Sequence, residues 1–151
     1  MTMDPARRHP PRPILAASVA VFRDGLVLLG ERAWPPAAGA FSLPGGLVEL
    51  GETLEAAALR ELREETGAEA RIGGFAGHVE VIARDEGDRV ERHFVVAAFW
   101  ATWLAVEPTP GEDTRSIRWV DPNALDDLPT TSGLPALLAK AAAAWRTAAG
   151  A

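Results

Sequence analysis

The sequence predicts a single domain of the α/β or α+β class, with a mixed sheet that is covered by helices on both faces. Its 151 residues are 48% hydrophobic and 24% charged, which suits one domain with a buried core. Apolar, β-rich runs occur before and between two segments of helical periodicity. Such an alternation favours strands in one sheet with helices packed against it, and we expect the domain to span residues 14–148.

The first 13 residues are rich in proline and arginine, and we expect residues 1–13 to form a disordered tail. No apolar segment of the signal-peptide type follows them, because residues 14–22 match a strand better. The alternative is that the arginines of the tail contact a phosphate or a partner subunit.

The first elements of the domain are predicted to be a hairpin and a short extended segment. Two apolar runs, Leu15–Phe22 and Leu26–Glu31, flank the turn signal Arg23-Asp24-Gly25. A loop of proline, alanine and glycine over residues 34–39 then leads into an extended piece at residues 41–43.

A helix is predicted from about Thr53 to Thr66. Thr53 is suited to cap its N-terminus, and Gly67 has the position of the residue that ends a helix in the left-handed conformation. The alanines at 56–58 raise the helix propensity of the segment.

The second half of the chain predicts two long strands and a terminal helix. The strands cover residues 75–84 and 90–104, with an acidic turn between them. A shorter strand is expected at 116–120 and a short helix at 121–128. Leucines and alanines then recur at helical spacing, which predicts an amphipathic helix over residues 135–147.

Composition excludes several classes of function. The net charge of −6 argues against a protein that binds nucleic acid by neutralising phosphates. The sequence contains no cysteine, which rules out disulfides and thiolate sites and fits a reducing compartment, so we expect a cytoplasmic protein. No apolar run is as long as a membrane helix, so we expect no membrane partner.

Three glutamates fall on one face of the predicted helix, because Glu61, Glu64 and Glu65 lie at spacings of three and four. Like charges at these spacings destabilise a purely structural helix. The crowding is explained if a divalent cation binds there, since Mg²⁺ prefers oxygen ligands and is often shared with substrate phosphates. Leu54 and Ala57 continue the same face, which indicates that it begins against protein and ends in a polar cleft.

The segment from Gly46 to Ala68 resembles the Nudix box, whose pattern is GX5EX7REUXEEXGU with U a bulky aliphatic residue. The matching positions are Gly46, Glu52, Arg60, Glu61, Leu62, Glu64, Glu65 and Gly67. Ala68 departs from the pattern, which weakens a packing contact and affects no ligand. The resemblance implies the Nudix fold, an α/β/α sandwich with a central mixed sheet, and a Nudix hydrolase that cleaves phosphoanhydride bonds.

The resemblance also implies roles for the residues of the box. Arg60 would orient the carboxylates through a bidentate pair, and Glu52 is the usual partner for it. The alternative for Glu52 is a favourable charge at a helix N-terminus. The implied ligands of Mg²⁺ or Mn²⁺ are the backbone carbonyl of Gly46 and the side chains of Glu61, Glu64 and Glu65.

Hydrolysis requires a general base, for which the sequence offers two sources. One is a glutamate of the box, such as Glu64. The other is an acid of the loop Glu107–Asp113, since some members of the family carry the base outside the box, and there Glu112 and Asp113 are the candidates. The alternative for the loop is an ordinary acidic surface segment.

Substrate binding is predicted for residues outside the box. Arg84 and Arg92 lie on the long hairpin and would bind phosphate or ribose, unless they are solvated strand residues. Phe41 and Trp34 would stack on a base, and the alternative for either is buried packing.

The resemblance leaves the substrate open and favours ADP-ribose, which would give AMP and ribose 5-phosphate. The sequence has no tyrosine, which the dinucleoside polyphosphate type expects, and lacks the signature run of the NADH type. The approach Phe41–Gly46 and the strand Arg118–Val120 look similar to short bacterial ADP-ribose pyrophosphatases. The alternatives are a (d)NTP pyrophosphohydrolase of MutT type and a regulator that binds a nucleotide without cleaving it. We expect a small nucleotide as the partner, and a homodimer stays open.

Overall fold

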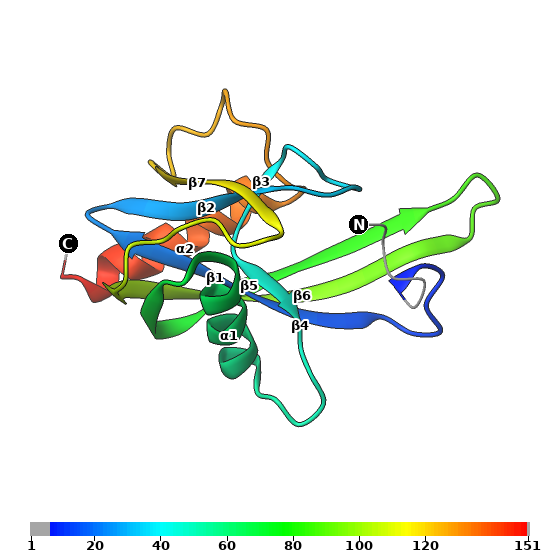
Figure 1. The fold of residues 1–151 in the computed structure, drawn as a ribbon, viewed down its shortest axis with the longest axis horizontal. Coiled ribbons are helices and arrows are strands. Elements are labelled where there is room, and N and C mark those ends of the chain that lie inside the picture. The colour runs from blue at the N-terminus through cyan, green and yellow to red at the C-terminus, as the bar shows by residue number, and fades with distance from the viewer. Residues whose placement is uncertain (1–6, 151) are drawn as a thin grey trace.

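The computed structural model describes residues 7–150, and within them a mixed sheet carries one helix on each face (Figure 1). This confirms the predicted fold class. The elements in chain order are β1 (Ile14–Arg23), β2 (Leu26–Arg32), β3 (Phe41–Ser42), β4 (Gly45–Leu47), α1 (Leu54–Thr66), β5 (Glu69–Arg84), β6 (Val90–Ala105), β7 (Thr114–Val120) and α2 (Leu134–Ala148).

Strand β1 lies at the centre of the sheet and connects its two halves. The main path of hydrogen-bonded strands is β3-β2-β1-β6-β5, with β4 added on β1 and β7 on β2. The pairing of β1 with β6 is parallel, whereas β1 is antiparallel to β2 and β4. Because strand side chains alternate between the faces, Val19 and Val21 pack on the α1 side while Ala20 and Phe22 pack on the α2 side.

The hairpin and the first helix form where local sequence signals predict them. Asp24 and Gly25 both adopt positive φ angles, as a tight two-residue hairpin turn requires. The Thr53 hydroxyl accepts the backbone N–H of Ala56, and Gly67 ends α1 in the left-handed conformation with φ 76°. Both ends of the helix that carries the three glutamates are therefore fixed by local interactions.

Strand β5 begins six residues earlier than the predicted position 75. Gly73 and Gly74 lie inside the strand, although a pair of glycines in a sequence is typical of a turn. A Cβ atom on Gly73 would overlap the six-membered ring of Trp100 on β6. The glycines therefore make room for an indole ring against the backbone of the strand.

The predicted short helix at residues 121–128 is wrong. The segment forms two separate turns, closed by hydrogen bonds from Ala124 N to Asp121 O and from Leu128 N to Leu125 O. The Asp121 carboxylate also accepts the N–H of Asn123, which favours a turn at the start of the segment over a helix.

The C-terminal end of β5 and the N-terminal end of β6 extend together as an arm beyond both helices (Figure 1). Residues that precede β1 bind to this arm: Arg8 pairs with Glu91 at 2.9 Å, and the His9 ring lies 2.8 Å from the Asp85 carboxylate. Residues 1–6 of the predicted tail lie outside the described residues. Among residues 7–150, no helix is both long and apolar enough to cross a membrane.

We predict that Gly73→Ala destabilises the protein, because its methyl group would overlap the Trp100 ring and force it out of place. Overpacking of this kind costs about 1–3 kcal/mol, which thermal unfolding would detect as a lower Tm. Gly87→Ala is the matched control, since its Cβ would lie 3.4 Å from the Asp85 carboxylate. Equal Tm values for Gly73→Ala and wild type would contradict the packing argument.

Candidate functional site

Strand β4 brings two glycines against the sheet and against α1. Gly45 and Gly46 pair with Ser18 and Ala17 of β1. A Cβ on Gly45 would lie 2.5 Å from the Ala17 carbonyl oxygen, and a Cβ on Gly46 would overlap the carboxyl group of Glu61. Both positions require glycine, because the backbone of β4 lies directly against β1 at Gly45 and directly beside the acidic face of α1 at Gly46.

The guanidinium of Arg60 organises the acids at the start and middle of α1. It binds both oxygens of Glu52, with Nε at 2.7 Å and Nη2 at 2.9 Å, and Nη1 donates to Glu61 at 2.9 Å. Nη2 also donates to the carbonyl of Leu47 at 3.0 Å, whereas the contacts to Glu64 are 3.4 Å or longer. The bidentate pair of Arg60 with Glu52 that the resemblance to the Nudix box implies is thus present.

These contacts shift the pKa values of both partners. Hydrogen bonds from Arg60, and then from the N–H of Glu49, lower the pKa of Glu52 to about 2. The hydrogen bond with Glu52 raises the pKa of Arg60 further above its ordinary value. Both side chains are therefore charged at neutral pH, and Glu52 serves as a fixed anchor for the guanidinium.

Glu61 and Glu65 are partly buried acids whose negative charges are incompletely compensated. Burial raises the pKa of Glu61, and the Arg60 hydrogen bond opposes this effect. Burial also raises the pKa of Glu65 to about 8, and the N–H of Gly45, which donates to it at 3.1 Å, opposes the rise only in part. Glu64, by contrast, has a side chain that is 58% exposed.

A divalent cation fits this set of groups. Two of the carboxylates are held in a region that disfavours their negative charge, and a cation would supply the missing compensation. In the described part of the chain the acids do not converge on one point, because Glu61 turns toward Arg60 and Glu65 toward Gly45. Binding would therefore involve rotation of side chains, for which the exposed Glu64 is free.

The loop at residues 107–113 packs on the C-terminal end of α1. Thr109 N donates to the Thr66 carbonyl and Gly111 N to the Glu65 carbonyl, both at 2.8 Å. A Cβ on Gly111 would come within 2.7 Å of the Glu64 carbonyl oxygen, so glycine permits the close approach. Glu112, the predicted loop base, follows Gly111 directly and is exposed.

Sequence reasoning missed a contact that joins this loop to a second loop. The indole N–H of Trp34, in the β2–β3 loop, donates to the Asp113 carboxylate at 2.8 Å. Ala33 N also donates to the Asp113 carbonyl at 3.3 Å. Aromatic and acidic residues 79 positions apart carry no local signal of such a pair.

The predicted substrate-binding residues lie apart from the acids of α1. Arg84 is on the arm and donates to the Asp88 carbonyl in the turn at its tip, and Arg92 pairs with Ala83 on the same arm. Phe41 is only 4% exposed and packs in the core on the α2 side, with the Arg118 guanidinium 5.0 Å from its ring centre. Phe41 would have to move to stack on a base.

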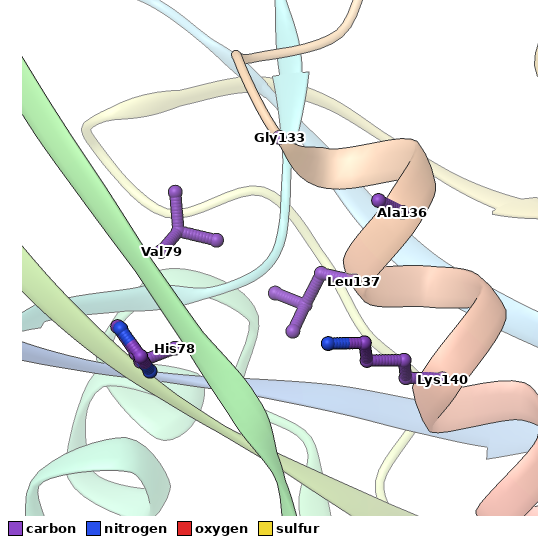
Figure 2. A pocket seen from close by; sticks show the side chains of 6 residues that line it. All are labelled: His78, Val79, Gly133, Ala136, Leu137 and Lys140. Carbon is purple, nitrogen blue, oxygen red and sulfur yellow. The ribbon is translucent and has the colours of Figure 1, made fainter.

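A cavity of about 230 Å³ lies between β5 and the start of α2 (Figure 2). Leu137 and Lys140 extend from α2 toward the strand that carries His78 and Val79. Helix α2 packs on the face of the sheet opposite α1, so this cavity is separate from the carboxylate group.

Comparison with known proteins gives a consistent result. A family model described as NUDIX domain matches residues 12–141. The chain is 33% identical over 116 residues to an ADP-ribose pyrophosphatase of Methanocaldococcus jannaschii, a match that covers 77% of this chain and 66% of that protein. It is 35% identical over 116 residues to a putative 8-oxo-dGTP diphosphatase 2 of Mycobacterium tuberculosis, covering 72% of this chain and 74% of the relative.

Solved structures support the same fold. A MutT NUDIX hydrolase from Burkholderia pseudomallei superposes with a TM-score of 0.76 at 29% identity, covering 85% of this chain and 98% of that one. The NUDIX domain of Shewanella oneidensis NrtR, solved in complex with ADP ribose, superposes with a TM-score of 0.71 at 22% identity and covers 90% of this chain and 89% of that one. The second likeness concerns the fold alone.

We predict that the metal-free protein loses stability as the pH rises from about 5 to 8. Because folding raises the pKa of Glu65 from 4.5 to about 8, the folded state binds more protons than the unfolded state in this window. The slope for one such group is about −1.4 kcal/mol per pH unit. Denaturant unfolding in the presence of a chelator, at a series of pH values, measures it.

Glu65→Gln should flatten this dependence, because the amide does not titrate. The exposed Glu55→Gln is the control and should follow wild type. The nearby charges of Glu61, Arg32 and Asp113 also act on Glu65 and stay the same in both variants. Parallel curves for wild type and Glu65→Gln would show that Glu65 ionises normally.

Proposed function

The chain belongs to the Nudix family and is a Nudix pyrophosphohydrolase, and on this premise we propose that it uses a divalent cation to cleave a nucleoside diphosphate linked to another group. The observation that carries the proposal is the pair of partly buried, incompletely compensated acids, Glu61 beside the backbone of Gly46 and Glu65 beside that of Gly45. The ion pair of Arg60 with Glu52 supports the position of Glu61 through the hydrogen bond that Arg60 donates to it.

We assign the cation as Mg²⁺ or Mn²⁺, because hard carboxylate and carbonyl oxygens suit these ions. When bound, such an ion polarises a phosphoryl oxygen and lowers the pKa of a water molecule. The groups that would hold it are the Gly46 carbonyl and the side chains of Glu61, Glu64 and Glu65.

The residues of the chain have distinct tasks in this proposal. Arg60, fixed by Glu52, holds the Glu61 carboxylate in one orientation through its 2.9 Å hydrogen bond. The general base that takes the proton from water is either Glu64, which is exposed on α1, or Glu112, which follows the loop residue bound to the Glu65 carbonyl.

For the substrate we propose ADP-ribose, with addition of water across the diphosphate to give AMP and ribose 5-phosphate. The likeness to an ADP-ribose pyrophosphatase supports this choice. The alternative is a (d)NTP pyrophosphohydrolase, which the similarity to a putative 8-oxo-dGTP diphosphatase and to a MutT hydrolase favours. A regulator that does not cleave its nucleotide is the remaining alternative, and the complete set of box carboxylates weighs against it.

We predict that a hydrolysis screen over ADP-ribose, dNTPs and nucleotide sugars shows turnover with Mg²⁺ or Mn²⁺ and none in excess chelator. Identification of the products by chromatography or mass spectrometry distinguishes the substrates: ADP-ribose yields AMP and ribose 5-phosphate, whereas a dNTP yields a monophosphate and pyrophosphate. Full turnover in excess chelator, or release of a free base, would sink the proposed chemistry.

We predict that Glu64→Gln lowers kcat on the order of 10²-fold or more, because it removes a proposed ligand or base. Its stability should stay close to wild type, since the side chain is exposed and the charge on a crowded acidic face decreases. Glu55→Gln, on the same helix, is the control for the loss of an exposed charge.

Glu112→Gln distinguishes the two candidates for the base. If Glu112 is the base, this variant lowers kcat and leaves the metal concentration for half-maximal activity nearly unchanged. If it runs at the wild-type rate, the base lies in the box. Wild-type kcat in both Glu64→Gln and Glu112→Gln would contradict both assignments.

A further inference from the structure

Trp34 is an exposed aromatic residue that is held in place at its edge. The residue is 42% exposed, although indole is among the largest apolar side chains. The N–H on the edge of the ring donates to the Asp113 carboxylate at 2.8 Å, and the neighbouring backbone of Ala33 binds the Asp113 carbonyl. The ring is thus fixed in position while part of its surface is open to solvent.

This ring is attached to the loop that packs on the acidic helix. Asp113 lies two residues after Gly111, whose N–H binds the Glu65 carbonyl. A Cβ on Gly111 would lie 2.7 Å from the Glu64 carbonyl oxygen and 3.0 Å from that of Glu65, so the loop that carries Asp113 lies directly against the turn of α1 that bears these acids. Trp34 is therefore tied to the edge of the carboxylate group.

We propose that Trp34 is the platform on which the nucleobase of the substrate stacks, and that Asp113 is the positioning residue that holds the indole. This inference rests on the proposed function, which supplies the nucleotide. An aromatic ring whose edge is already hydrogen-bonded loses little conformational freedom when a base covers its face. Phe41, which lies shortly before the Nudix box, is buried and offers no comparable surface.

The proposal separates base recognition from the chemistry of the diphosphate. When the base of a nucleotide stacks on Trp34, the diphosphate of the same nucleotide would extend toward the carboxylates of α1. Stacking accepts any base, because each has a π-face. The indole therefore selects nucleotides over sugar phosphates, and it discriminates weakly among adenine, guanine and the pyrimidines.

The test compares Trp34→Leu with wild type on the nucleotide that the screen identifies. The KM for this nucleotide and the inhibition constant for AMP should each rise about tenfold or more, while kcat changes by less than about threefold. The inhibition constant for ribose 5-phosphate, which has no base, should stay at the wild-type value. Trp34→Phe keeps a π-face and should show a smaller loss than Trp34→Leu.

Phe75→Leu is the matched control, because it removes an exposed aromatic ring from β5, at the opposite edge of the sheet. Thermal unfolding of each variant verifies that it is folded. If wild type cleaves nucleotides and Trp34→Leu leaves KM and the AMP inhibition constant unchanged, the stacking proposal is overturned and the proposed function stands. An equal rise in the inhibition constant for ribose 5-phosphate would also overturn the stacking proposal. If wild type cleaves no nucleotide, the proposed function fails and this inference with it.

Asp113 variants test the positioning role. Asp113→Ala removes the acceptor of the indole N–H and should raise KM, whereas Asp113→Asn keeps an oxygen acceptor and should restore part of the loss. A large fall in kcat for Asp113→Asn with an unchanged KM would show that Asp113 acts in the chemical step, and would overturn its assignment as a positioning residue.

Discussion

The guanidinium of Arg60 is the interaction on which the geometry of the site depends. It binds Glu52 through two nitrogen atoms, Glu61 through a third contact and the backbone of Leu47 through a fourth. These contacts hold the segment between β4 and α1 against the middle of the helix. The Arg60 side chain thus performs two tasks, because it orders this segment and compensates the charges of Glu52 and Glu61. Its reach does not extend to Glu65, which receives a backbone N–H instead.

The sheet contributes by bringing a strand without side-chain bulk beside the helix. Strand β4 pairs with the central strand β1, so its distance from the sheet is set by backbone hydrogen bonds. The helix packs on the same face of the sheet through Ala57, Ala58 and Leu62. Between these two constraints little space remains, and a Cβ at Gly46 would overlap the Glu61 carboxyl group. The glycine of the box is therefore needed for packing, apart from any role of its carbonyl.

Local signals account for the parts of the fold and site that the sequence predicts well. Thr53 and Gly67 fix the ends of α1, and the Arg60–Glu52 pair forms within a single loop and helix. The start of β5 and the turns at residues 121–128 are decided by tertiary contacts and by side-chain hydrogen bonds, which outweigh propensity. Phe41 illustrates the same limit, since an aromatic residue near the box is placed in the core by packing that no local pattern shows.

The loop at residues 107–113, whose contacts no local pattern predicts, connects the acidic helix α1 to the rest of the sheet. Helix ends leave carbonyl groups without partners, and here the N–H groups of Thr109 and Gly111 bind the carbonyls of Thr66 and Glu65. The same loop leads into β7, which pairs with β2 at Thr114 and Arg32. The backbone of the last turn of α1 is thus fixed by a segment that belongs to the β2–β7 edge of the sheet. Because Glu64 and Glu65 lie on this turn, their position depends on strands on both sides of β1, and a substitution in the loop can alter the acids without touching them.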